Sequence, residues 1–253
     1  MKRLDAGEAA AAAGLLAAIV ALWWLASHQQ WVSKVFLPTP EAAWASLIDG
    51  LAGGDLGGFT LATVGRMLVG WLCASVLGIA LGALIGSSAA ARAWLLPTLE
   101  FIRPLPASAL LPLAIALFGL SPVMVLAVVS FGAMWPVLLN TVHGFATVHP
   151  RLGEVARGLQ IPPGAFAVKF GLPNALPDIL AGMRLALTVA LIVTVVGEMI
   201  ASQAGLGHAI LLAARSFRAA DLFAGVLLLG LIGLVSNSLL AAAEHRLLRW
   251  QRP

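Results

Sequence analysis

Residues 67–91 read MLVGWLCASVLGIALGALIGSSAAA and contain no Asp, Glu, Lys or Arg. A helix needs roughly 20 mostly apolar residues to cross the hydrocarbon core of a membrane. A charge at the bilayer centre costs about 2.5–3.5 kcal/mol, so a long charge-free run marks a candidate span. Similar runs cover residues 9–33, 104–150, 185–197 and 222–243, and the run at 104–150 is long enough for two short crossings. The pattern predicts about six transmembrane helices.

The composition supports this interpretation for the whole chain. Of its 253 residues, 60% are hydrophobic and 10% are charged, whereas soluble domains carry roughly 25% charged residues. We therefore expect an all-α membrane protein with a single transmembrane domain over residues 1–253. The first apolar run could be a secretory signal, but it is long, contains Trp23-Trp24 and lacks an A-x-A site. A retained first span at about 9–33 is favoured.

The basic residues indicate topology more than nucleic-acid binding. The net charge is +4, but Lys and Arg are spread between the apolar runs, and they are not clustered on a soluble module. Cytoplasmic loops carry an excess of Lys and Arg. With six spans, both chain ends are expected in the cytoplasm together with Lys2, Arg3, Arg92, Arg103, Arg151, Arg157, Lys169, Arg246, Arg249 and Arg252. Lys34, Arg66, Arg215 and Arg218 are then at or near the outside.

An amphipathic segment precedes the second span, and a row of glycines lies within it. Residues 41–51 form an amphipathic pattern with Trp44, Leu47, Ile48 and Leu51 on one face, which predicts a short helix on the outer membrane surface. The second span, about residues 59–87, carries Gly70, Gly78, Gly82 and Gly86. Small residues at four-residue spacing let another helix approach closely, although glycine is also simply tolerated in membrane helices.

Prolines and glycines divide the remaining apolar runs. Pro104, Pro106 and Pro112 predict a broken or short third span, because each proline removes a backbone donor and clashes one turn back. Residues 119–122 read GLSP and predict a turn into a fourth span that ends near Thr141. The fifth and sixth spans are expected at about 175–201 and 222–243.

Few polar residues interrupt the predicted spans: Arg66, Asn140, Asp178, Arg184, Glu198 and Asn237. An ionisable group inside a membrane is a functional candidate by default. Three of these residues also fall near span ends, where water and headgroups can solvate them, and Arg184 can extend its charge toward the surface. We keep Arg184, Glu198 and the neighbouring Met199 as candidates for a translocation path.

Several kinds of chemistry lack their sequence signature. A P-loop ends in Gly-Lys followed by Ser or Thr, but the three lysines are followed by Arg3, Val35 and Phe170. The single cysteine, Cys73, excludes a disulfide framework, and no two histidines have H-E-x-x-H spacing. We therefore expect no ATPase activity, metal or cofactor, and an intramembrane enzyme is disfavoured. A stand-alone secondary carrier or channel is an alternative, but carriers typically show denser midplane charges.

One polar stretch does not fit a span. Residues 149–178 read HPRLGEVARGLQIPPGAFAVKFGLPNALPD, with Leu152, Val155, Ala156 and Leu159 on one helical face. Pro162-Pro163-Gly164 is expected to stop this helix. An apolar face beside charged residues favours a docking element for a partner, and a helix lying on the inner leaflet is the alternative.

This stretch resembles the E-A-A-x-x-x-G loop, closing in I-x-L-P, of permease subunits of binding-protein-dependent ABC importers. The matching positions are Glu154, Val155, Ala156, Gln160, Phe170, Leu172 and Pro173. Because Gln160 stands where the family has a glycine, we expect the turn to use Pro162-Pro163-Gly164. The resemblance implies a cytoplasmic coupling loop at about 149–175 that contacts an ATPase through Arg151, Glu154, Val155, Ala156, Arg157, Gly158, Gln160, Leu172 and Pro173.

Other motifs resemble the nitrate, sulfonate and taurine branch of that family over nearly the whole chain. They are FLPTP at 36–40, Arg66 with Gly70, RPLP at 103–106, LPL at 111–113 with FG at 118–119, and GEM at 197–199 with GLG at 205–207. The resemblance implies a type I ABC importer (MetI-like) permease fold with its core at about 59–245, in a bacterial inner membrane.

The same resemblance implies partners and a class of substrate. The partners are a second permease copy forming a homodimer, two copies of an ABC ATPase subunit, and a periplasmic or lipid-anchored substrate-binding protein. The substrate is expected to be a small anion such as a sulfonate, taurine or nitrate. A pyrimidine vitamin precursor or another small organic solute is the alternative.

Overall fold

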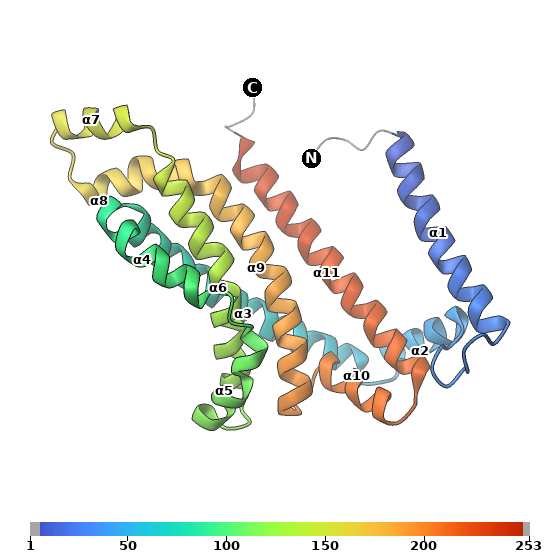
Figure 1. The fold of residues 1–253 in the computed structure, drawn as a ribbon. Helices are drawn as coiled ribbons and strands as arrows, with labels where there is room; N and C mark the ends of the chain where they lie inside the picture. Colours follow the sequence, from blue (N-terminus) through green and yellow to red (C-terminus); the bar gives the residue numbers. More distant parts are fainter. Residues whose placement is uncertain (1–5, 250–253) are drawn as a thin grey trace.

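The computed structural model describes residues 6–249, and over this range the chain forms helices and short connections without a strand. Figure 1 shows the arrangement. The elements are α1 Ala6–His28, α2 Pro40–Ala52, α3 Leu56–Gly86, α4 Ala89–Ile102, η1 Ala107–Leu110, α5 Leu111–Phe118, α6 Pro122–Ala146, α7 Pro150–Gly158, α8 Pro163–Phe166, η2 Ala167–Gly171, α9 Leu172–Ala201, α10 Leu206–Arg215 and α11 Ala219–Leu247. Lys2, Arg3 and Arg252, which entered the topology argument, lie outside the described residues.

Five segments of the described chain are long and apolar enough to cross a membrane: α1, α3, α6, the stretch from α8 through α9, and α11. A sixth is formed by α4 together with residues 107–118, which bend by 77° at the break between them. Pro104 and Pro106 lie in this break, where a missing backbone donor interrupts a regular helix. The prediction of about six spans with a broken third span is confirmed.

Two predicted boundaries are wrong. The first span ends at His28 instead of about residue 33, because Gln30 adopts a left-handed conformation with φ 53° and the Trp31 N–H bonds to Ala26 O at 3.1 Å. This bond closes the helix end in a Schellman-like turn. The fourth span ends at Ala146 instead of near Thr141. By contrast, α9 begins at Leu172 and ends at Ala201, close to the predicted fifth span at about 175–201.

Helices α3, α6 and α9 pack together as the core, with α6 between the other two. The glycine face predicted on α3 meets α6. A Cβ added at Gly78 would lie 2.8 Å from Val137 Cβ, and one added at Gly82 would lie 2.6 Å from Thr141 Cβ. The prediction that these glycines permit close helix approach is therefore confirmed.

On its opposite side, α6 packs closely against α9, and glycine again permits the close approach. A Cβ at Gly144 would lie 2.6 Å from Ala175 Cα, and a Cβ at Gly182 would lie 2.7 Å from Pro136 O. Glycine on either helix thus removes the side chain that would separate the two backbones. The tight packing makes α3, α6 and α9 the rigid part against which other elements are positioned.

The first two helices form a peripheral unit. Most described side chains of α1 are exposed. Near its end, Trp23 Nε1 donates to Pro38 O, just before α2, and Trp24 Nε1 donates to Glu41 Oε1 in α2, both at 2.9 Å. The predicted amphipathic helix is α2. It buries Leu47 in the core, while Trp44 remains 61% exposed.

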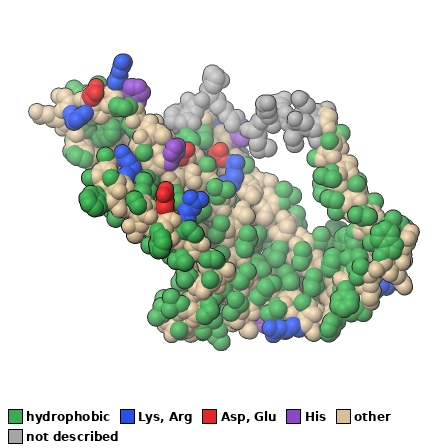
Figure 2. Space-filling view, in the orientation of Figure 1, with side chains coloured by type: hydrophobic (Ala, Val, Ile, Leu, Met, Phe, Trp, Pro, Cys, Tyr) green, Lys and Arg blue, Asp and Glu red, His purple; other side chains and the backbone are tan. Residues whose placement is uncertain are grey.

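The ends of the helices sort into two sides of the molecule. In Figure 1, α7, the start of α1 and the end of α11 lie on one side, and α2, α5 and α10 lie on the other. Figure 2 shows many charged side chains near the α7 side, and a surface rich in hydrophobic side chains between the two sides. This distribution suits a protein whose middle faces lipid.

Candidate functional site

The predicted docking helix is present as α7, nine residues long. His149 caps its start, with Nδ1 accepting a hydrogen bond from the Arg151 N–H at 3.3 Å, and Pro150 occupies the first helical position. A proline is favourable there because its missing N–H would have no partner inside the helix. Figure 1 shows α7 at the edge of the molecule, beyond the ends of α6 and α9.

The apolar side chains of α7 are mostly turned away from the rest of the chain. Leu152, Val155 and Leu159 are 42%, 57% and 69% exposed, whereas Ala156, expected on the same face, is 5% exposed. Glu154, Arg157 and Gly158 are also exposed, and Arg157 Nε donates to Gly153 O at 3.3 Å. Exposed apolar groups beside charged ones are what a helix needs to enter a partner's groove.

Gln160 itself makes the turn after α7, so the predicted use of Pro162-Pro163-Gly164 for that turn is wrong. Gln160 has φ 54°, in the left-handed region, and its N–H bonds to Arg157 O at 3.1 Å. The next N–H, from Ile161, bonds to Ala156 O at 2.9 Å. These two bonds make a Schellman turn, which usually places glycine where Gln160 stands. The prolines instead start α8.

The second half of the loop connects α7 to α9. Rings of Phe166 and Phe170 stack with centroids 5.4 Å apart, and a Cβ at Gly171 would lie 2.6 Å from Phe145 Cε1 at the end of α6. The turn η2 is π-helical and is followed by Leu172-Pro173 at the start of α9. Proline cannot donate a backbone bond, and π-type turns occur at such interruptions. Movement of α7 would therefore displace the adjoining ends of both α6 and α9.

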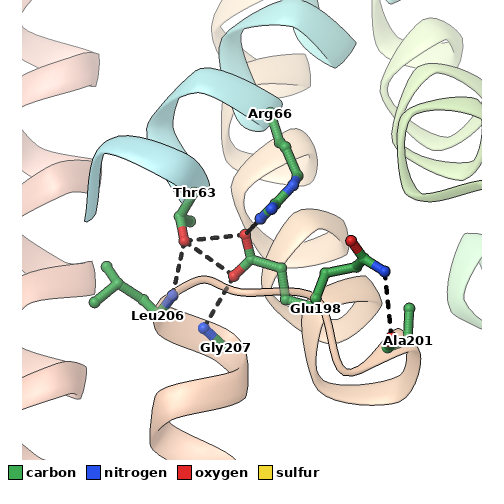
Figure 3. Close-up of polar contacts among 7 residues, drawn as sticks. Thr63, Arg66, Glu198, Ala201, Leu206 and Gly207 are labelled. Carbon is green, nitrogen blue, oxygen red and sulfur yellow. Dashed lines mark hydrogen bonds and ion pairs between the residues drawn. The ribbon is translucent and has the colours of Figure 1, made fainter. Parts of the chain in front are cut away.

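A second polar cluster lies at the opposite end of α9 (Figure 3). Glu198 is fully buried, and its carboxylate accepts hydrogen bonds from Arg66 Nη1 at 2.5 Å and from the Gly207 N–H at 3.0 Å. Thr63 Oγ1 lies 2.9 Å from Glu198 Oε2 and accepts a bond from the Leu206 N–H, also at 2.9 Å. The cluster joins α3, the end of α9 and the start of α10.

This burial excludes the interpretation that Glu198 is solvated at the end of a span. The motifs GEM and GLG meet because the carboxylate of the first accepts from the backbone of the second. Gly205 lies against the same carboxylate, where a Cβ would clash. The sequence argument did not identify Thr63, because a threonine in an apolar helix carries no signal of its own.

Of the other proposed path residues, Arg184 lies apart from Glu198, whereas Met199 directly follows it in α9. Arg184 on α9 pairs with Glu244 on α11, and their side chains are 42% and 25% exposed. Met199 is half-buried beside Glu198. The cleft described in the next paragraph is lined by none of these three residues, Arg184, Glu198 and Met199. Their role in a translocation path stays a prediction.

A cleft of about 670 Å³ lies between the break after α4, helix α6 and helix α9. Polar residues on its lining are Arg103, Ser108, Trp135, Asn140 and His143, and its apolar lining includes Leu185, Val189 and Ile192. The sequence argument assigned Arg103 to the cytoplasmic side. In the structure it lies at the bend of the broken span, because α4 begins directly after α3 and brings residue 103 back among the helices.

Comparison with known proteins identifies the family. Residues 74–250 match the family described as "Binding-protein-dependent transport system inner membrane component". The chain is 34% identical over 240 residues to a Bacillus subtilis protein named as an aliphatic sulfonates transport permease, SsuC, covering 94% of this chain and 87% of that protein. It is 29% identical over 243 residues to the taurine transport system permease protein TauC of Escherichia coli, covering 94% and 88%.

A third relative is the nitrate import permease protein NrtB of Leptolyngbya laminosa, which is 31% identical over 211 residues, covering 81% of this chain and 76% of that protein. The family match includes α7, the cleft and the Glu198 and Gly207 part of the polar cluster, whereas Thr63 and Arg66 precede the matched residues. The extent of these matches agrees with the helical membrane architecture. The chain belongs to the family of binding-protein-dependent transport system inner membrane components.

Proposed function

We propose that this permease subunit imports a small anion, such as a sulfonate, taurine or nitrate, and receives the energy of ATP hydrolysis through α7 from a separate ATPase subunit. The observation that carries the coupling role is the exposure of Leu152, Val155 and Leu159 on a short helix at one side of the molecule. Such a face suits a groove in a partner. The chain itself has no lysine in a P-loop pattern.

The proposed assembly has two permease copies, two ATPase subunits and an extracellular binding protein in a bacterial inner membrane. The ATPase contacts on this chain would be Arg151, Glu154, Val155, Ala156, Arg157, Gly158, Gln160, Leu172 and Pro173. Because the described ends of α1 and α11 lie on the α7 side in Figure 1, an ATPase bound at α7 would place both termini in the cytoplasm. The binding protein would then dock on the side of α2, α5 and α10.

The connections of α7 suggest how ATP would drive transport. Helix α7 follows α6 after a short connection and leads through α8 and η2 into α9. Closure of an ATPase dimer on ATP would move α7 and so change how α6 and α9 are oriented. The permease would switch between two states, one favoured by ATP and the other by its absence. The loaded binding protein would bias the same switch from outside.

The substrate proposal rests on the names of the relatives. They include permeases named for aliphatic sulfonates, taurine and nitrate. All three named substrates are small molecules with a negatively charged oxygen-rich group. A transport assay with ethanesulfonate, taurine and nitrate would test this directly.

The coupling role is tested by co-expressing the permease with its ATPase subunit and purifying the complex through the permease. Glu154→Lys reverses an exposed charge on α7 and should abolish co-purification of the ATPase while the permease remains in the membrane. Asp49→Lys makes the same reversal on α2, on the opposite side, and should leave co-purification unchanged. Normal ATPase binding and normal uptake by the Glu154 variant would contradict the assignment.

Two alternatives give different results in the same system. If α7 only lies on the inner leaflet, Glu154→Lys should strengthen association of the loop with anionic lipids, because a lysine replaces an acidic group, and should leave ATPase binding unaltered. If the chain is a secondary carrier, the purified chain alone should transport the solute down an ion gradient without ATP. The proposed function requires that ATP and the ATPase subunit are both needed.

A further inference from the structure

The cleft between the bend after α4, helix α6 and helix α9 has an uncompensated positive charge. Its lining contains Arg103 and His143 but no Asp or Glu. Other arginines of the packed helices have partners: Arg66 pairs with Glu198, and Arg184 pairs with Glu244. The exposed side chain of Arg103 makes no hydrogen bond or ion pair with another group of residues 6–249. A charge among membrane helices usually pairs with another group or marks a substrate route.

Neutral donors lie in the same cleft. Trp135 is only 7% exposed, and its indole nitrogen is buried without a hydrogen-bond partner in the described chain. Buried donors without partners are uncommon and call for an explanation. Ser108 adds a hydroxyl to the lining, and Asn140 Nδ2 donates to Pro136 O at 2.8 Å, which leaves the second amide hydrogen of Asn140 available.

The wall of the cleft opposite these groups is apolar. Helix α9 contributes Leu185, Val189 and Ile192, and Leu185 and Ile192 are each 58% exposed. A ligand that uses both parts of the lining needs a charged, oxygen-rich head and an apolar tail. An alkanesulfonate has both, whereas nitrate has no tail to contact the wall.

Two other cavities offer different chemistry. A cavity of about 770 Å³ beside α2, α10 and α11 is lined by Asp49, Asp55, Asp221 and Arg218. Arg218 already pairs with Asp221 at 3.2 Å, so the remaining carboxylates would repel an anion. A groove of about 470 Å³ between α3 and α11 is lined almost entirely by apolar residues and resembles a lipid-facing surface. The charge in the cleft around Arg103 is the one that complements the proposed substrates.

We propose that this cleft is a substrate subsite on the translocation path, where Arg103 binds the sulfonate head and the α9 wall contacts the alkyl tail of an alkanesulfonate. Ser108, Trp135 and Asn140 would donate additional hydrogen bonds to the sulfonate oxygens. The inference rests on the proposed function and narrows its substrate to organic sulfonates with an apolar tail.

The test uses the complete importer in proteoliposomes, with permease, ATPase and binding protein, and measures radiolabelled ethanesulfonate taken up per ATP hydrolysed. Arg103→Gln should lower this ratio about tenfold, because a hydrogen bond to a charged group is lost. Arg103→Lys keeps the charge and should retain most of the ratio. Arg92→Gln makes the matched change on α4 outside the cleft and should leave the ratio unchanged.

A second variant tests the apolar wall without touching the charge. Val189→Phe narrows the cleft and should reduce uptake of butanesulfonate per ATP more than uptake of methanesulfonate. This comparison stays informative if Arg103→Gln fails to assemble. An equal effect on both sulfonates would overturn the proposed tail contact.

The failures of the two proposals are distinguishable. If the wild-type importer transports none of the sulfonates, the substrate proposal fails, and with it the subsite. If the wild type transports them and Arg103→Gln keeps the wild-type ratio, the subsite is overturned while the importer function stands. If Arg103→Gln lowers uptake and ATP hydrolysis equally, Arg103 acts on folding or coupling, and the subsite is again overturned.

Discussion

Arg66 Nη1 lies 2.5 Å from Glu198 Oε1, and this ion pair joins α3 to the last turn of α9. Glu198 is fully buried, and the Arg66 side chain is 17% exposed. Thr63 and the Gly207 N–H complete the hydrogen bonds to the carboxylate. Removing one member of such a pair leaves the other charge without a partner in a poorly solvated site, which is strongly unfavourable.

Replacing Glu198 by alanine should therefore destabilise the protein by about 3–5 kcal/mol. Glu198→Gln should cost less, because the amide keeps the shape and can still accept the hydrogen bonds from Thr63 and the Gly207 N–H. Equilibrium unfolding of the purified permease in mixed detergent measures these differences. The pair formed by Arg184 and Glu244 provides the control, because it is partly exposed. Glu244→Gln should cost less than about 1 kcal/mol.

A similar loss of stability in Glu198→Ala and Glu244→Gln would show that the buried pair has no special role. The double variant Arg66→Met with Glu198→Met gives an independent check. It should be more stable than Glu198→Met alone, because it leaves no unpaired charge.

The glycine face of α3 gives a second prediction. Gly82→Ala places a Cβ 2.6 Å from Thr141 Cβ and 2.7 Å from Leu138 O, so α3 and α6 must separate. We expect a loss of about 1–3 kcal/mol, as in other overpacked interiors. Gly65→Ala is the matched control on the same helix, because nothing lies within 4 Å of its added Cβ. That control should be neutral or stabilising by up to about 1 kcal/mol.

Thermal unfolding of the two alanine variants, monitored by helical circular dichroism, compares them directly. If Gly82→Ala proves as stable as Gly65→Ala, the close packing of α3 on α6 is not what requires glycine at position 82. The prediction would then have to be withdrawn for the whole glycine face.

The sequence predicted features that depend on neighbouring residues. Charge-free runs located the spans, four-residue spacing located the glycine face at Gly78 and Gly82, and the prolines located the break after α4. Features that depend on distant residues were missed. The partners of Glu198 on α3 are Thr63 and Arg66, and the separation of 135 residues between Thr63 and Glu198 gives no local pattern.

Arg103 shows a different limit of the sequence argument. The excess of Lys and Arg in cytoplasmic loops describes loops on average and assigns each arginine by its order between spans. This rule does not detect the 77° bend that leaves Arg103 within a broken span, next to a cleft.

The left-handed conformation of Gln160 was missed because the sequence argument applied a preference for glycine as if it were strict. The rule that glycine occupies such turns is statistical, and glutamine can adopt the same backbone at a modest cost.

That cost leads to a third prediction. Gln160→Gly should retain ATP-driven uptake and should hold the turn at least as well, because glycine adopts positive φ without steric penalty. Gln160→Val should lower uptake severalfold, because a β-branched side chain strongly disfavours this region. ATP-driven uptake in proteoliposomes, with ATPase co-purification, measures both. Gly153→Ala, within α7 but outside the proposed ATPase contacts and with open space around its Cβ, should behave as wild type.

Equal uptake by the valine and glycine variants would mean that the turn at Gln160 does not determine how α7 is presented. Loss of uptake in Gly153→Ala as well would indicate that α7 tolerates no substitution. The conformation of residue 160 would then not be the cause.

The last prediction concerns topology and uses two glycines that can accept a cysteine. Gly53 lies between α2 and α3, and Gly153 lies in α7; neither has an atom within 4 Å of an added Cβ. In a Cys73→Ser background, with the permease expressed alone, a membrane-impermeant maleimide should label Gly53→Cys in right-side-out vesicles. It should label Gly153→Cys only in inside-out vesicles. The physical reason is that α2 and α7 lie on opposite sides of the hydrophobic surface in Figure 2, which the charged reagent cannot cross. Labelling of both positions from one side would contradict the arrangement in which α7 and both chain ends face the cytoplasm, and it would remove the basis for placing an ATPase at α7.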